Sequence, residues 1–339
     1  MSAARRPLRS WPDALIAAID QLPAAPWLVY LVATLVAVGV FIGQRLAEGI
    51  EINPVTVGYT ALTFLPLAAM HYANRAAARA LDDFRPALGR LEPESDSLRR
   101  RLTTMPFWPA IIAALTGAGV LVIGQFTAGG LWGMRPEYST GTNVATAIMQ
   151  LILNMSFAAF VFHTVVQVMV IVHIHRDATA IELWNTPPHN AFSNLTLVLA
   201  IAIVVPYSLV EILSALNSQL TVVEITIYAV AMGLSVAVFV LPLSGVRSRL
   251  LRERTREFDE TGRAFAVAAA QLRAAVESGD VASAPALKDA LTGLALDQER
   301  LRTVSTWPWT ADTFRGFVTT LGIPLVLWFL TNLLGRVLF

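Results

Sequence analysis

The chain has 339 residues, of which 55% are hydrophobic and only 14% are charged, and its formal net charge is +1. Soluble domains carry about 25% charged residues, so this composition argues against a soluble protein and predicts an all-α, polytopic membrane protein. The absence of cysteine excludes disulfides, thiolate metal sites and cysteine nucleophiles.

Seven apolar stretches are long enough to cross a bilayer as helices, since the hydrocarbon core needs roughly 20 such residues. They lie near 27–43, 55–71, 107–127, 143–173, 192–215, 221–243 and 313–335. The segments expected on the inner side hold 22 of the basic residues, against 3 on the outer side. The positive-inside rule therefore predicts a cytoplasmic N-terminus and an external C-terminus.

The expected domain order starts with a cytoplasmic amphipathic segment, 1–26, in which Ser10 caps a short interfacial helix. A six-helix transmembrane bundle follows over 27–244. Its second span continues into a cytoplasmic helical extension, 72–106, which breaks near Pro86 and Gly89.

A cytoplasmic helical hairpin is predicted over 245–306, joined at the turn SGDVASAP. One arm repeats an apolar residue every seven positions, and the other arm carries a second apolar stripe. The members are Leu251, Phe258, Phe265 and Leu272 in the first arm, and Leu287, Leu291, Leu294 and Leu301 in the second. These seams could close on each other, on other cytoplasmic helices or on a neighbouring subunit.

The segment 307–339 is expected to form an interfacial hinge and the last span. Pro308 ends the preceding helix, and Trp307 and Trp309 favour the membrane interface. Thr310 is a good cap for the last helix. Two alternatives stay open here: a rigid elbow, or a moving coupler between the hairpin and the last span.

Polar residues inside the spans are candidate sites because lipid makes them costly. The fourth span offers either interhelical hydrogen bonds or a wet cavity, and the last span offers either close packing or a narrow pore. The candidates are Glu211 and Glu224 for an outer vestibule; Gln150, Asn154, His163 and Gln167 in the fourth span; and Thr313, Thr320, Pro324 and Thr331 for a pore.

No sequence motif for catalysis or cofactor binding is present, so we expect no enzyme, no cofactor and no metal site. The histidines do not pair at similar depths, which argues against haem. The only lysine, Lys288, falls in the cytoplasmic hairpin, so a retinal Schiff base in the last span is excluded.

This plan resembles the seven-transmembrane ion channel superfamily that includes insect odorant and gustatory receptors. The split last helix (285–304, the Trp307–Trp309 break and 313–335) resembles theirs, and the ending TNLLGRVLF matches two of four positions of their C-terminal motif, at Thr331 and Phe339. The resemblance implies a homotetramer with Thr320 and Thr331 near a central pore. It also implies a small-molecule pocket in the outer halves of spans two to six.

The first functional hypothesis is an oligomeric, ligand-gated, cation-conducting channel whose last helix lines the pore. The alternative is a non-conducting membrane sensor or scaffold that binds a partner through its cytoplasmic helices, and a small-solute transporter is a third hypothesis. The expected partners are the lipid bilayer, other copies of the chain and a small-molecule ligand, with no nucleic acid. The expected location is a bacterial-type inner membrane or a plasma membrane.

Overall fold

The computed structural model describes residues 9–127, 138–178, 190–217, 222–279, 284–304, 306, 307, 309–322 and 326. Over these ranges the chain is helical and contains no strand, in agreement with the predicted all-α class. Within them, four helical runs are long and apolar enough to cross a membrane: Pro26–Ala47, Gly89–Ile123, Thr140–Asp177 and Tyr228–Ser278. These apolar helices indicate an integral membrane protein. The number of spans, seven, and their orientation stay predictions.

Helix α1 (Trp11–Asp20) begins where the sequence predicts it. The side chain of Ser10 accepts a hydrogen bond from the backbone N–H of Asp13 at 3.4 Å, as an N-cap does. The indole N–H of Trp11 donates to the carbonyl oxygen of Ala110 at 3.3 Å. The amphipathic helix therefore docks on the bundle with its apolar side.

Helix α2 (Pro26–Ala47) covers the first predicted span. The second predicted span, 55–71, is not one continuous helix, because α3 (Pro54–Ala61) ends before α4 (Leu65–Phe84) begins. Pro66 lies in the first turn of α4, where a proline starts a helix but cannot continue one from the preceding turn. The prediction of an unbroken second span is thus corrected to two helices.

Helix α4 lies at the centre of the fold and is buried along most of its length. Small side chains make this possible, since Ala73, Ala77 and Ala80 are each no more than 3% exposed. The chain then breaks as predicted near Pro86 and Gly89, where two 3-10 turns, η1 (Arg85–Ala87) and η2 (Gly89–Glu94), lead into α5 (Ser95–Thr103). Gly89 has a φ of 57°, which favours glycine.

Two long apolar helices, α6 (Phe107–Thr127) and α7 (Thr140–Asp177), pack against each other. They approach closely at Gly117, where an added Cβ would lie 2.3 Å from the backbone oxygen of Asn154. Glycine permits this contact because it has no side chain. The close approach fixes the depth of α7 relative to α6.

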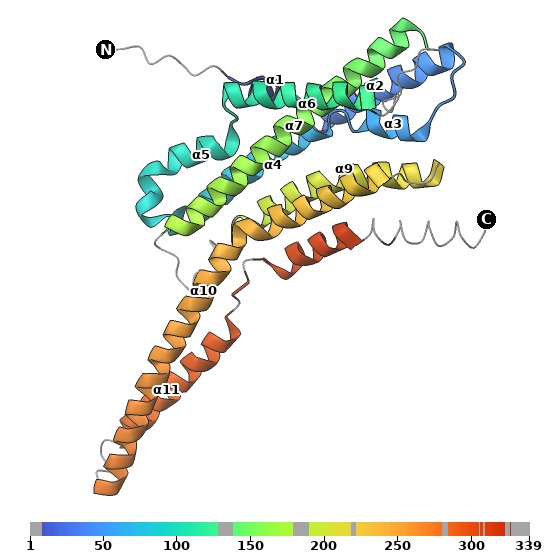
Figure 1. The fold of residues 1–339 in the computed structure, drawn as a ribbon. Helices are drawn as coiled ribbons and strands as arrows, with labels where there is room; N and C mark the ends of the chain where they lie inside the picture. Colours follow the sequence, from blue (N-terminus) through green and yellow to red (C-terminus); the bar gives the residue numbers. More distant parts are fainter. Residues whose placement is uncertain are drawn as a thin grey trace, which may run out of the picture.

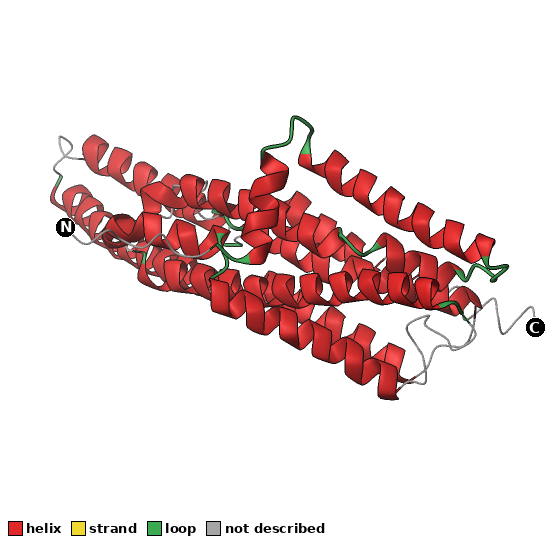
Figure 2. Cartoon of the chain, turned by 90° about the horizontal axis from the view of Figure 1, so that it is seen from above, coloured by secondary structure: helices red, strands yellow, loops and turns green. Residues whose placement is uncertain are grey.

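Helices α9 (Ser193–Asn217) and α10 (Val222–Ser278) form a second layer that packs on α4 and α7 (Figure 1). Most helices of the bundle run along one common direction when seen from above (Figure 2). Helix α10 bends and continues beyond the bundle (Figure 1), and Pro242 lies inside it. We attribute the bend to this proline, which removes a helical hydrogen bond.

Helix α11 (Ala284–Thr303) returns along the protruding half of α10 to form the predicted hairpin (Figure 1). Its core near the bundle consists of Val246, Leu250 and Leu301, with Phe258 packed against them. The predicted seam is confirmed in part, because Phe258 and Leu301 belong to this packing. Farther along α10, Phe265 is 36% exposed, whereas Ala268 and Ala275 are buried.

Candidate functional site

A buried polar network joins α4 to α7. The Oδ1 atom of Asn74 lies 2.9 Å from His163 Nε2 and accepts a hydrogen bond from Gln167 Nε2 at 3.3 Å. Gln167 also donates to the carbonyl oxygen of Leu102 at 2.7 Å. All three side chains are buried, so the sequence-predicted His163 and Gln167 are brought together by a residue outside the predicted set.

A second group of polar side chains lies next to Asn74 on α4. Asp20 Oδ1 lies 3.1 Å from His71 Nε2 and 2.5 Å from Arg75 Nη2. His71 Nδ1 lies 3.3 Å from the hydroxyl oxygen of Tyr30. This arrangement suits a neutral ring that donates from Nε2 to the carboxylate and accepts from the tyrosine.

These side chains face a cavity of about 660 Å³, the α1–α4–α5 cavity, whose lining includes His71, Asn74 and Arg75. Apolar residues make up part of the wall, and its other charged and polar members are Arg9, Arg99, Arg100, Thr103, Thr104, Asp13 and Asp20. Arg75 pairs with Asp20 and Arg99 pairs with Asp82, so two of the four guanidinium groups already have a carboxylate partner.

Asp13 is a half-buried carboxyl of this cavity. It accepts a hydrogen bond from the backbone N–H of Met105 at 3.0 Å, which ties α1 to the start of α6. Burial raises the pKa of Asp13 above its ordinary 3.8, and hydrogen bonds from Ser10 and Met105 oppose this shift.

A separate cluster lies at the Thr140 end of α7. Glu48 accepts hydrogen bonds from the hydroxyl groups of Ser139 and Thr142, the second at 2.6 Å. These hydrogen bonds lower the pKa of Glu48, with that from Ser139 contributing most. The guanidinium of Arg45 stacks over the ring of Tyr138 at 4.3 Å. The cluster fastens the end of α2 to the start of α7.

The other predicted polar residues of the fourth span behave differently. Gln150 is 5% exposed and shares the buried face of α7 with His163 and Gln167. Asn154 is half-buried, and its side chain donates to the backbone oxygen of Gln150 at 2.8 Å within the same helix. The structure therefore joins His163 and Gln167 in one network and leaves Asn154 outside it.

The tryptophan elbow packs on α10. The ring of Trp309 stacks on Phe239 with 5.3 Å between centroids, and Arg247 lies 3.9 Å above the ring of Trp307. Thr310 caps the next helix, 311–322, by accepting from the backbone N–H of Thr313 at 3.2 Å, as predicted. Pro308 lies outside the described residues.

The structure describes only two of the four predicted pore residues, Thr313 and Thr320. The hydroxyl of Thr320 donates to the carbonyl oxygen of Gly316 at 2.8 Å, and that of Thr313 lies 2.7 Å from the hydroxyl of Thr310. Pro324 and Thr331 lie outside the described residues, as do the side chains of Glu211 and Glu224. Thr313 and Thr320 stay pore candidates.

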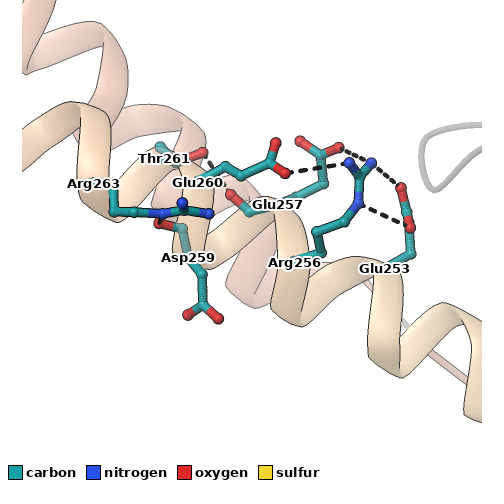
Figure 3. Close-up of polar contacts among 7 residues, drawn as sticks. All are labelled: Glu253, Arg256, Glu257, Asp259, Glu260, Thr261 and Arg263. Atoms are coloured by element: carbon teal, nitrogen blue, oxygen red, sulfur yellow. Dashed lines mark hydrogen bonds and ion pairs between the residues drawn. The ribbon is translucent and has the colours of Figure 1, made fainter.

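The outer surface of the hairpin is charged. Arg256 forms ion pairs with Glu257 at 3.0 Å and with Glu260 at 3.2 Å, and it also pairs with Glu253 (Figure 3). Arg263 donates to the backbone oxygen of Asp259 at 3.3 Å on the same surface (Figure 3). Such a density of charge is incompatible with lipid, so this half of α10 lies outside the bilayer.

Sequence reasoning missed Asn74, Asp20 and Tyr30. Asn74 lies in the stretch ANRAAARALDDF, which reads as an exposed extension of the second span. The signal that could have found it is its position three residues after His71, on the same side of a helix. Among the described residues, no group of three or more His, Cys, Asp or Glu side chains could hold a metal ion.

Comparison with protein-family models, with curated proteins and with solved structures gives no match for this chain. A functional assignment therefore depends on its own residues.

Proposed function

We propose that this protein is a non-enzymatic membrane sensor or scaffold that passes a change in its membrane bundle to the α10–α11 hairpin. The observation that carries the proposal is the continuity of α10, a single helix of 57 residues. At about 1.5 Å per residue it is roughly 85 Å long, and a bilayer core is about 30 Å thick. One continuous helix, bent near Pro242, therefore belongs to both parts of the molecule.

Contacts at the bend support this proposal. Arg249 of α10 donates to the backbone oxygen of Ala178 at 2.9 Å, just after α7 ends. Arg254 donates to the backbone oxygen of Val304 at 3.5 Å, just after α11 ends. The root of the hairpin is thus held by the membrane bundle on one side and by the elbow on the other.

The proposal includes the seven-span plan with the N-terminus in the cytoplasm, so that the hairpin lies on the cytoplasmic side. It also includes assembly of several copies, which would be four if the resemblance to the receptor channels holds. The mass of the purified protein in lipid nanodiscs tests this part, and a monomer would contradict it. The membrane is proposed to be a bacterial-type inner membrane or a plasma membrane.

The coupling itself is tested by distance measurement, because the chain has no cysteine of its own. Spin labels at Val276→Cys on the hairpin and Tyr72→Cys on α4 occupy exposed positions. Bilayers of short-chain and long-chain phosphatidylcholine impose different thicknesses and hence different helix tilts. We expect the label-to-label distance to differ between the two bilayers. The same distance in both would contradict the proposal.

Ion conduction along the last helix is a second candidate. It is favoured by the shallow packing of helix 311–322, which buries Phe317 but leaves Phe314 and Val318 about half exposed. Such a helix lies at the edge of the protomer, where it could meet its copies around a central axis. We expect Thr320→Trp to reduce ion flux into liposomes, whereas Val36→Trp, at an exposed position on α2, does not. Flux that survives Thr320→Trp in a folded oligomer would contradict this candidate.

A further inference from the structure

The buried face of α7 carries polar atoms that have no hydrogen-bond partner among the described residues. Three of them lie close together in the sequence: His163 Nδ1, Thr164 Oγ1 and Gln167 Oε1. Each of these residues is no more than 1% exposed. A buried polar atom without a partner destabilises a fold, and a water molecule is its usual partner in a protein interior.

The chemistry of these atoms points to water rather than to an apolar ligand. Because Asn74 Oδ1 can only accept, the neutral ring of His163 donates to it from Nε2, which makes Nδ1 an acceptor. Gln167 Oε1 is also an acceptor, and the hydroxyl of Thr164 can donate or accept. Two acceptors and a hydroxyl on neighbouring turns of one helix match the two donors and two acceptors of water.

The α1–α4–α5 cavity gives water a way in. Asn74 lines this cavity, and the same side chain contacts both His163 and Gln167. One side chain, Asn74, thus lines a space of about 660 Å³ and also contacts two of the residues that carry the unpartnered atoms, His163 and Gln167. Much of its lining is apolar, but Arg75 and Thr103 give water hydrogen-bonding groups along the wall next to Asn74.

We propose that water passes from the α1–α4–α5 cavity beside Asn74 into a polar pocket formed by His163, Thr164 and Gln167 of α7. This pocket is a buried hydration site inside the fourth predicted span, and it is independent of the coupling role of α10.

Silver ion tests this proposal because it is small, travels in water and reacts with thiolate. A cysteine in a hydrated place reacts, whereas one in apolar surroundings stays protonated and inert. Thr164→Cys places a thiol in the proposed pocket, and Val170→Cys is the matched control. Val170 is 0% exposed, packs in the apolar core and lies closer to the Asp177 end of α7. Unreacted thiol is counted with a maleimide after denaturation.

We expect Thr164→Cys to react at least tenfold faster than Val170→Cys, with both variants eluting like the parent protein. We expect Asn74→Leu, added to Thr164→Cys, to slow the reaction by a similar factor. Equal rates for the two single variants would overturn the hydrated pocket. An unchanged rate with Asn74→Leu would overturn the route past Asn74. The cysteine-free parent shows whether silver alone disturbs the fold.

Discussion

The rings of Phe239 and Phe317 lie nearly parallel, with 3.9 Å between their centroids and 14° between their planes. The first belongs to the membrane half of α10 and the second to helix 311–322. Together with Trp309 they form a stack that closes the elbow against α10. Any movement of the last helix must therefore act on the same helix that carries the hairpin.

This stack predicts a measurable coupling between its two rings. Phe239→Ala and Phe317→Ala should each lower the stability of the detergent-solubilised protein, and the double variant should lose less than their sum. Aromatic pairs are worth about 1 kcal/mol beyond their buried area, which is the expected interaction term. Phe314→Ala is the control because that ring is 52% exposed. Fully additive losses would contradict the contact.

The close approach of α6 and α7 gives a sharper prediction. Gly117→Ala should prevent normal folding, because its Cβ would lie 2.3 Å from the Asn154 backbone oxygen and no flexible side chain could give way. Gly119→Ala on the same helix meets nothing within 4 Å. It should be neutral or stabilising by up to about 1 kcal/mol, the helix preference of alanine over glycine. The yield of purified protein and its elution profile distinguish the two variants. Equal yields and equal profiles for Gly117→Ala and Gly119→Ala would contradict the close packing of α6 against α7.

The hairpin should depend on its apolar root and not on its surface charges. Leu301 is 2% exposed, so Leu301→Ala should cost about 2–5 kcal/mol of local stability, the usual range for a buried leucine. Arg256→Gln should have little effect, since its ion pairs are exposed to solvent. Hydrogen exchange of α11 measures both. Faster hydrogen exchange of α11 in Arg256→Gln than in Leu301→Ala would contradict the prediction that the hairpin depends on its apolar root.

Asp13 should make stability depend on pH in acid. Because burial raises its pKa above 3.8, the folded state binds this proton more tightly than the unfolded state does. The stability it contributes is present below pH 3.8 and is lost as pH rises through the higher folded pKa. Asp13→Asn keeps an acceptor for Met105 and should remove this loss. Thermal unfolding across that range is the measurement, and an identical pH profile in the variant would contradict the assignment.

Glu48 should make stability depend on pH in the opposite direction to Asp13. Hydrogen bonds from Ser139 and Thr142 lower its pKa below 4.5, so its contribution is present above that pH and is lost as pH falls through the folded pKa. Ser139→Ala should shrink this acid-side loss, since Ser139 is its main donor. The comparison is the thermal unfolding of parent and variant from neutral pH to below 4.5. A steeper loss in the variant would contradict the role given to Ser139.

Local signals in the sequence predicted local structure well. Ser10 and Thr310 cap helices as expected because a cap depends on a few adjacent residues. Long apolar runs also predicted helices, because such a run is likewise a property of adjacent residues. The break before Pro66 was missed, because the hydropathy of 55–71 is continuous and only the position of the proline reveals it.

Contacts between distant segments could not be predicted in this way. Asn74 contacts His163 across 89 positions of the chain, and nothing near either residue indicates the other. The hairpin seam was predicted only in part. Phe258 and Leu301 pack as expected, but Phe265 is exposed while the small Ala268 and Ala275 are buried, which a search for large apolar residues misses. Small residues give little hydrophobic signal but decide how closely helices approach.

The central claim is that the hairpin follows the membrane bundle through α10 and the elbow stack. Its most direct test is the Val276–Tyr72 spin-label distance in thin and thick bilayers, measured in Phe317→Ala and in Phe314→Ala. We predict that the shift between bilayers persists in Phe314→Ala and is at least halved in Phe317→Ala. A shift of the same size in both variants, or no shift in either, would contradict the claim.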